Sequence, residues 1–179
     1  MRIKNIFITG PIHIGKSTII NRVIDRLPDL RIGGFRTLPI YKDNKRGGFI
    51  FNSLLNGTGK IFAHVDLKSN DRYDIYNFNY RVFEEVGVST LQTALLESDV
   101  ILMDEIGVME EQAEKFRQMI VKCCDSPCFV FGAFQERATW FLKMLKERVD
   151  TKIFVIDNDN RNSIFNQIIS LINENLLSN

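Results

Sequence analysis

The stretch "IFITGPIHIGKSTIINRVI", residues 6–24, places an apolar run directly before a glycine-containing turn and a helical pattern. Residues 3–9 have the uninterrupted apolar character of a buried strand. Residues 16–27 carry apolar side chains at helical spacing, and Pro28 fits the end of that helix. Between strand and helix, residues 10–17 match the pattern G-x-x-x-x-G-K-[ST] in the structural context that this pattern requires.

This pattern predicts a phosphate-binding loop, or P-loop. Its glycines let the backbone turn tightly and expose N–H groups, and the start of the next helix adds a positive dipole end. We expect Lys16 to reach the β- and γ-phosphates, Ser17 to ligate Mg²⁺ and Thr18 to help hold the α-phosphate. His13 is an unusual member of the loop: it either contacts phosphate or gates the site with pH, or it points outward, and we expect the outward orientation.

A second apolar strand, residues 99–107 ("DVILMDEIG"), ends in two acids. A parallel strand delivers its last residues to the edge of the sheet where ligands bind. Asp104 is therefore predicted to hold the magnesium shell, and Glu105 to orient or deprotonate the attacking water. Glu110 and Glu111 are alternative bases, although both also suit the first turn of the following helix.

Buried strands alternate with helical patterns along most of the chain, which predicts an α/β fold whose parallel sheet is covered on both faces. The expected strands are 3–9, 99–107, 128–134 and 152–157, and the expected helices are 16–27, 80–97, 110–124, 136–148 and 161–177. Residues 33–65 break this alternation, and their β-like pieces and turn signals predict two or three antiparallel strands as an edge extension. Residues 66–77 are polar and aromatic and are expected to form a loop.

The composition is that of an ordinary globular protein, since 45% of the 179 residues are hydrophobic and 25% are charged, and the length favours a single domain. A formal net charge of +1 argues against nucleic-acid binding through a broadly basic surface. The apolar runs fall short of the roughly 20 residues that a membrane span needs, and the first is too short for a signal peptide. Cys123, Cys124 and Cys128 indicate buried thiols in a reducing compartment rather than a metal or redox cluster, so we expect a cytoplasmic protein.

Several segments resemble the small nucleoside-triphosphatases of the THEP-one type, a family that includes the vertebrate cancer-related nucleoside-triphosphatase. "DEIGVME" (104–110) resembles the family's D-E-I-G-x-M-E, which is fairly specific in combination with the P-loop. Shorter pieces follow the family's order over nearly the whole chain: "GGFRT" (33–37), "RGGF" (46–49), "FEEVGVSTLQTAL" (83–95) and "NRN" (160–162). The chain departs from the family pattern at His13, Pro39, Tyr41 and Asn162, none of which is expected to carry the chemistry.

The resemblance implies a three-layer, RecA-like P-loop fold with a mostly parallel sheet. It also implies Mg²⁺-dependent hydrolysis of nucleoside 5′-triphosphates, ATP and GTP among them, to diphosphate and phosphate with broad base tolerance. It assigns nucleotide binding to two segments, which are Gly10, Pro11, Ile12, His13, Ile14, Gly15, Lys16, Ser17 and Thr18, and Ile101, Leu102, Met103, Asp104, Glu105, Ile106 and Gly107. With the motif chemistry, Lys16 and Glu105 are the expected catalytic residues, and Ser17 and Asp104 the expected metal ligands.

A positive side chain that neutralises charge in the transition state would complete such a site. Arg137, which follows the strand at 128–134, and Arg46, in the antiparallel region, are candidates, although a solvated helix face is the simpler account of Arg137. Asn160 and Arg161 either touch the base or cap the last helix. Phe134 and Trp140 could stack on a base, although core packing is the default for aromatic residues.

Two other functions stay open. One is phosphate transfer to a nucleoside or polynucleotide, with the basic helix at 136–148 as a lid. The other is a slow nucleotide-dependent switch in which residues 66–77 order around the γ-phosphate. The expected ligands are nucleoside triphosphates, no membrane or nucleic-acid partner is expected, and the sequence does not indicate a protein partner.

Overall fold

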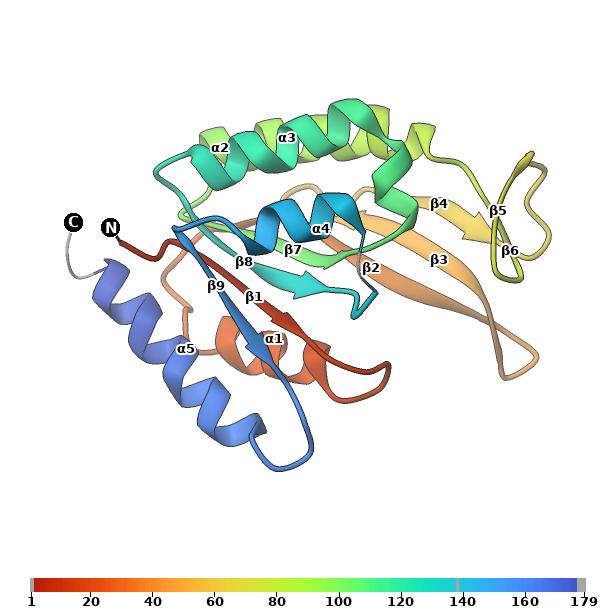
Figure 1. The fold of residues 1–179 in the computed structure, drawn as a ribbon. Helices are drawn as coiled ribbons and strands as arrows, with labels where there is room; N and C mark the ends of the chain where they lie inside the picture. Colours follow the sequence, from red (N-terminus) through yellow and green to blue (C-terminus); the bar gives the residue numbers. More distant parts are fainter. Residues whose placement is uncertain (1, 138, 177–179) are drawn as a thin grey trace.

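The computed structural model describes residues 2–137 and 139–176, which form one nine-stranded sheet with helices on both faces (Figure 1). The strand order is β5-β6-β4-β3-β2-β7-β8-β1-β9. The strands are β1 (Asn5–Thr9), β2 (Ile32–Lys42), β3 (Lys45–Ser53), β4 (Gly59–His64), β5 (Asp71–Tyr73), β6 (Tyr76–Phe78), β7 (Val100–Ile106), β8 (Phe129–Phe134) and β9 (Thr151–Val155). The helices are α1 (Lys16–Ile24), α2 (Val88–Glu97), α3 (Glu114–Asp125), α4 (Trp140–Lys146) and α5 (Arg161–Leu176), with a π-helical turn η1 (Phe83–Gly87) and a 3₁₀ turn η2 (Met109–Gln112).

The five neighbouring strands from β2 to β9 are parallel and form the centre of the molecule. Helices α2, α3 and α4 cover one face and α1 and α5 cover the other (Figure 1). Because both faces are covered, β1 and β8 are buried along their whole length, which explains their unbroken apolar sequences. The expectation of an α/β fold with a helix-covered parallel sheet is confirmed.

Beyond β2, the sheet continues with the antiparallel strands β3, β4, β6 and β5. β2 itself pairs with a different strand on each side. Residues 32–36 of β2 pair in parallel with β7, and residues 35–42 pair antiparallel with β3. Aromatic contacts tie this region to the helices: the ring centroids of Phe35 on β2 and Phe116 on α3 lie 5.5 Å apart, and those of Phe51 on β3 and Phe83 on η1 lie 5.9 Å apart. Each fully buried phenylalanine stabilises the fold by about 1.5–3 kcal/mol.

Beyond shifts of a few residues at element ends, such as that of α1 at Ile24, three expected elements differ from the structure. The loop expected over residues 66–77 is wrong in part, because β5 and β6 form a short hairpin there and β6 pairs with β4. The helix expected over 110–124 is interrupted at Ala113, whose extended backbone (φ −89°, ψ 92°) separates η2 from α3. The helix expected over 136–148 is shorter, because the Thr139 side chain accepts a hydrogen bond from the Leu142 N–H and starts α4 only at Trp140. Residue 177, expected at the end of the last helix, lies outside the described residues.

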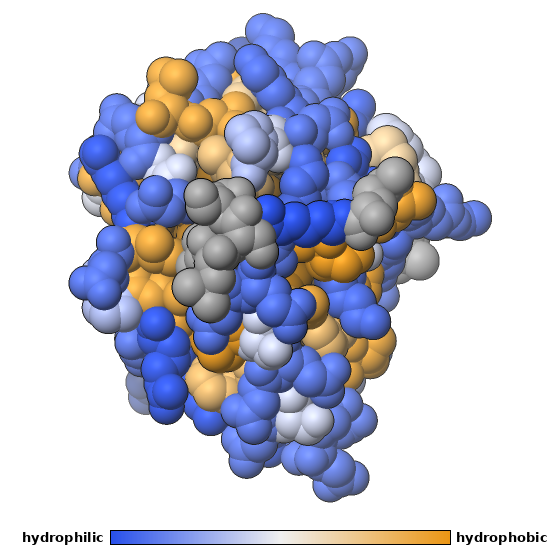
Figure 2. Space-filling model, turned by 90° about the vertical axis from the view of Figure 1, so that its left-hand side faces the viewer, coloured by the Kyte–Doolittle hydropathy of each residue, from blue (hydrophilic) through white to orange (hydrophobic). Residues whose placement is uncertain are grey.

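All parallel strands point the same way, so the P-loop after β1 and the acids at the end of β7 lie at the same edge of the sheet (Figure 1). The opposite end of the molecule has a mostly hydrophilic surface with scattered apolar residues (Figure 2). Within residues 2–137 and 139–176, we find no helix that combines the length and the apolar character needed to cross a membrane.

Candidate active site

The P-loop connects β1 to α1 through residues in the left-handed region: Gly10 has φ 150°, His13 φ 66° and Gly15 φ 102°. A Cβ atom on Gly10 would lie 2.7 Å from the carbonyl oxygen of Ile156, so this position requires glycine. No side chain caps α1, and its first N–H groups are therefore free to bind an anion. His13 is exposed, which agrees with the expected outward orientation.

Lys16 folds back across the P-loop. Its Nζ donates hydrogen bonds to the carbonyl oxygens of Gly10 (2.9 Å) and Pro11 (3.2 Å), and it lies 3.7 Å from Oε2 of Glu105. Ser17 and Thr18 follow in the first turn of α1 and are exposed. The structure thus brings together the lysine and the second acid, which the sequence analysis had placed in separate motifs.

The second predicted nucleotide-binding segment, residues 101–107, is mostly part of the core. Four apolar side chains of the segment are fully buried in the cores on the two faces of the sheet: Ile101, Leu102, Met103 and Ile106. Asp104 is 7% exposed and Glu105 is half-buried, and a cis peptide bond joins them. The segment assigned by resemblance therefore contributes side chains to the site through its two acids.

Arg36 is a site residue that the sequence analysis missed. In the parallel pairing of β2 with β7 it lies opposite Asp104, and its Nε is 3.9 Å from Asp104 Oδ2. The quoted segment "GGFRT" contains Arg36, but only the strand order and register place it beside the acids. We call Arg36, Asp104 and Glu105 the charged edge. With Lys16 they form a row in which the two adjacent acids lie between two positive side chains.

Burial changes the pKa of two carboxyl groups in this region, those of Asp104 and Glu110. Burial raises the pKa of Asp104 to about 6. The nearby charge of Arg36 opposes this rise, the charge of Glu105 adds to it, and that of Lys16 opposes it. Burial also raises the pKa of Glu110 to about 8. The Glu110 carboxyl oxygen Oε2 accepts a 2.9 Å hydrogen bond from the Gly107 N–H, so this acid holds the loop after β7.

A pocket of about 220 Å³ lies beside the P-loop, at the end away from the charged edge. It is lined by Gly15, Thr18, Ile19, Arg22, Asn158, Asp159, Arg161 and Asn162. Arg161 reaches the P-loop, since its Nη1 lies 3.4 Å from where a Cβ of Gly15 would be. Asn160 instead closes the turn before α5: its Nδ2 donates to the Val155 carbonyl (3.0 Å) and its Oδ1 accepts from the Asp157 N–H (3.0 Å). Asn160 therefore supports the start of the last helix, while contact of Arg161 with a base stays a prediction.

The comparisons with known proteins agree with this geometry. A family model described as NTPase matches residues 5–169. The chain belongs to this NTPase family. The nucleoside-triphosphatase THEP1 of Thermotoga sp. (strain RQ2) is 38% identical over 170 residues, which are 95% of this chain and 96% of the relative. THEP1 of Thermotoga maritima is 37% identical over the same shares of the two chains.

Two solved structures of NTPases have the same fold. The crystal structure of THEP1 from Aquifex aeolicus has a TM-score of 0.79 and 29% identity, and the match covers 93% of this chain and 98% of that one. The solution structure of a human cancer-related nucleoside triphosphatase has a TM-score of 0.78 and 25% identity, over 96% of this chain and 98% of that one. The resemblance seen in the sequence motifs is confirmed, as is the α/β P-loop NTPase fold.

The donor set of this NTPase fits a magnesium ion held jointly with a substrate. Within the described residues, no three or more His, Cys, Asp or Glu side chains are grouped to hold a metal ion. Mg²⁺ commonly takes one or two protein oxygens and completes its shell with phosphate and water. The Ser17 hydroxyl and the Asp104 carboxylate are ligands of this kind. Cys124 is not, because burial raises the pKa of its thiol to about 12 and keeps it protonated.

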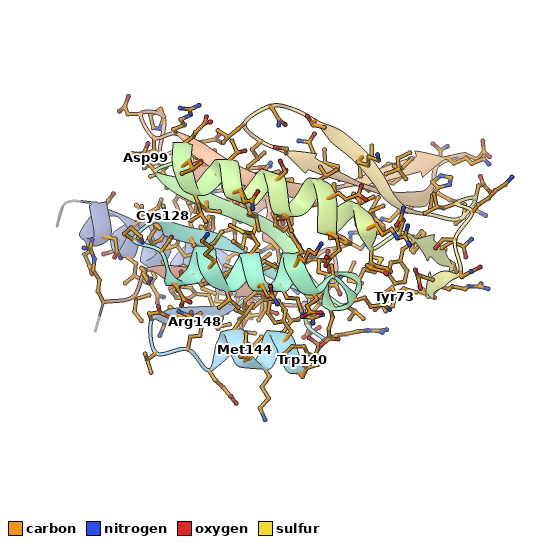
Figure 3. All side chains as sticks on the ribbon, turned by 90° about the horizontal axis from the view of Figure 1, so that it is seen from above. Tyr73, Asp99, Cys128, Trp140, Met144 and Arg148 are labelled. Atoms are coloured by element: carbon orange, nitrogen blue, oxygen red, sulfur yellow. The ribbon has the colours of Figure 1, made fainter. Side chains whose placement is uncertain are left out.

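The other candidate arginines are held by aromatic rings. The Arg137 guanidinium lies 5.4 Å from the ring centroid of Tyr73, which Figure 3 shows on the hairpin side of the molecule. The Arg46 guanidinium lies 5.6 Å from the ring centroid of Phe49. These cation–π contacts hold both guanidinium groups beside aromatic rings, while Arg46 Nε stays buried without a hydrogen-bond partner among the described residues.

The aromatic candidates lie away from the P-loop. Phe134 is fully buried and stacks on Phe7 at 4.1 Å, as core packing predicts. Trp140 is 60% exposed on α4, beside Met144 (Figure 3), so the default of core packing is wrong for this residue. Since α4 covers the face of the sheet opposite to α1, Trp140 does not line the pocket beside the P-loop.

Proposed function

We propose that this chain hydrolyses nucleoside 5′-triphosphates to diphosphate and phosphate in a Mg²⁺-dependent reaction, with Lys16 and Glu105 as catalytic residues. Its family makes it a nucleoside-triphosphatase, a hydrolase acting on nucleoside triphosphates. The observation that carries the assignment of residues is the 3.7 Å distance between Lys16 Nζ and Glu105 Oε2. It means that a phosphate held by the P-loop amides would lie directly beside a carboxylate able to act on water.

The contacts of Lys16 suit an exchange of ligands. In the described structure its ammonium group is held by two carbonyl oxygens of its own loop. A phosphate oxygen carries more negative charge than a carbonyl oxygen and makes a stronger, charge-assisted hydrogen bond. Lys16 would therefore turn to the β- and γ-phosphates when they bind, which also releases Glu105 to face the attacking water.

The hydrolytic step needs positioning and charge neutralisation more than covalent chemistry. Glu105 would orient the water in line with the leaving oxygen and accept its proton. Ser17 and Asp104 would hold Mg²⁺, which when bound neutralises charge on the β- and γ-phosphate oxygens. The P-loop amides at residues 10–18 would bind the remaining phosphate oxygens.

The pocket beside the P-loop supports broad base tolerance. It adjoins Gly15 and Thr18, so it is the natural place for the nucleoside when the γ-phosphate points to the charged edge. Its described lining is polar and aliphatic and contains no aromatic platform. Arg22 Nη1 donates a 3.0 Å hydrogen bond to Asn162 Oδ1, so part of this lining is already paired within the protein. Such a lining accommodates a nucleoside without selecting one base by its hydrogen-bond pattern.

We further propose that residues 1–179 act as one RecA-like domain, with about residues 33–65 as a hairpin extension. Supporting this, β8 lies between β1 and β7, so one strand separates the P-loop from the acids. Free buried thiols at Cys123 and Cys124 support the predicted cytoplasmic location.

A phosphate-release screen tests the proposed function. The protein is incubated with ATP, GTP, CTP and UTP, each with and without magnesium. We expect phosphate release from all four with magnesium and background release without it. Parallel reactions with γ-labelled ATP and a panel of nucleosides or 5′-hydroxyl oligonucleotides test the transferase alternative, because label that appears only as free phosphate excludes it. No release from any triphosphate would contradict the proposal.

A further inference from the structure

Arg36 lies on the face of the sheet that carries the P-loop. Residues paired across neighbouring parallel strands point to the same face, and Arg36 pairs with Asp104. Leu102, two residues before Asp104 and on the same face, packs in the cluster formed with α1 and α5. Phe35, the neighbour of Arg36, packs in the cluster under α2 and α3. The alternation along β2 therefore directs the guanidinium toward the side where α1 begins.

The guanidinium of Arg36 has hydrogen-bond donors without acceptors. Its Nε and Nη2 atoms are buried, and neither finds a hydrogen-bond partner among the described residues. The nearest acid is Asp104, at 3.9 Å, which is an electrostatic contact but too long for a hydrogen bond. Buried polar atoms in native proteins are nearly always satisfied. A planar fork of unsatisfied donors beside Asp104, whose neighbour Glu105 contacts the P-loop lysine, is suited to an anionic ligand.

Without Arg36, the site with a bound triphosphate would have an excess of negative charge. Asp104 and Glu105 oppose Lys16 alone, and a triphosphate adds further negative charge. In hydrolysis the transition state spreads charge over the γ-phosphate oxygens, where a bidentate guanidinium is the best-matched donor. Asp104 turns Oδ2 toward Arg36, so its Oδ1 stays free for the magnesium shell. Asp104 can therefore contact Arg36 and the magnesium shell at the same time.

The other arginines near the site have other contacts, and although Arg46 Nε is also buried without a hydrogen-bond partner among the described residues, Arg46 lies on β3 opposite Tyr41 and not opposite either acid. Arg137 and Arg46 stack on aromatic rings, and Arg161 lines the pocket at the nucleoside end of the P-loop. We propose that Arg36 contacts the γ-phosphate from the side opposite to Lys16 and neutralises the charge that develops there in the transition state. This inference rests on the proposed hydrolysis of nucleoside triphosphates and adds a catalytic residue to it.

The first test compares Arg36→Gln and Arg36→Lys with the matched control Arg31→Gln. Arg31 lies just before β2 at the opposite end of the strand, where its Nη2 pairs with Glu97 at 2.6 Å on the surface. For Arg36→Gln we expect kcat to fall by about 10³-fold, with the triphosphate Kd little changed. Arg36→Lys keeps a charge but loses the fork, so it should recover only part of the rate. Arg31→Gln should match the wild type.

The second test separates a transition-state contact from a structural effect. The nucleoside diphosphate with aluminium fluoride imitates the transferring phosphoryl group, and wild-type protein should bind it far more tightly than the diphosphate alone. Arg36→Gln should lose this gain while it still binds the diphosphate. Millimolar guanidinium, well below denaturing concentrations, should restore part of the activity of Arg36→Ala. Thermal unfolding of each variant shows whether it folds, and Arg36→Lys replaces any variant that does not.

Three outcomes would overturn the inference while the wild type still hydrolyses triphosphates. One is near-normal kcat in Arg36→Gln. A second is an equal loss of ground-state triphosphate binding, which would make Arg36 a binding residue only. A third is full recovery of Arg36→Gln at higher pH, which would mean that Arg36 acts only by keeping Asp104 ionised. If the wild type itself releases no phosphate, the proposed function fails first, and the two failures are thus distinguishable.

Discussion

The P-loop and the charged edge meet around the same site, but they are built in different ways. The P-loop is a continuous segment whose glycines, lysine and hydroxyls are specified by spacing along the chain. The charged edge combines Asp104 and Glu105 from β7 with Arg36 from β2, and it exists only because those strands are neighbours in register. A local loop can hold phosphate by itself, whereas turnover needs groups on the far side of the γ-phosphate. The contrast predicts that changes in the P-loop weaken both binding and turnover, and that changes in the charged edge weaken turnover alone.

The largest expected effect is that of Lys16→Ala. Loss of the ammonium group removes charge compensation at the β- and γ-phosphates, so kcat/KM should fall by at least about 10³-fold. Triphosphate binding measured by calorimetry should weaken as well. Lys122→Ala, an exposed lysine on α3, is the matched control and should behave as wild type. Normal turnover in Lys16→Ala would mean that this loop does not hold the reacting phosphates.

Glu105→Gln is expected to separate binding from turnover. The amide keeps the shape of the side chain but cannot accept a proton, so hydrolysis should fall by about 10²–10⁴-fold while triphosphate binding stays intact. Single-turnover phosphate release and calorimetry on the same sample measure the two quantities. Glu97→Gln, which only breaks a surface pair with Arg31, should leave both unchanged. An unaltered rate in Glu105→Gln would remove its assigned role in orienting water.

The last expected effect concerns stability and not turnover, and it comes from Glu110, which supports the loop after the charged edge. Its pKa is about 8 in the folded protein and near its ordinary value of 4.5 in the unfolded chain, so the folded state retains a proton between these values. The free energy of unfolding should therefore decrease as the pH rises from about 5 to about 8. Glu110→Gln should remove this part of the decrease, as seen in thermal unfolding across that pH range. If the stability of Glu110→Gln depends on pH as that of the wild type does, Glu110 is not the source of the decrease. Glu147→Gln, on the exposed end of α4, is the control and should keep the wild-type pH dependence.

The elements with strong local patterns were predictable. The P-loop context, the strand ending in Asp104 and the alternation of buried strands with helices all follow from short-range spacing, and the structure agrees. The hairpin of β5 and β6 was not, because strands of three residues carry too short a pattern and depend on pairing with β4. The exposure of Trp140 was also not predictable, since it depends on how α4 lies against α3 and not on residue type.

The sequence by itself determined the family, the α/β class and the position of the proposed phosphate-binding loop, because glycine conformation, apolar spacing and motif order are properties of the chain over a few residues. Only the tertiary structure decided that Lys16 meets Glu105, that Arg36 faces Asp104 and that Arg161 turns to the P-loop. The physical reason is that strand order and register bring distant residues to one edge of the sheet. Their charges then act on each other through a partly buried environment that no single segment creates.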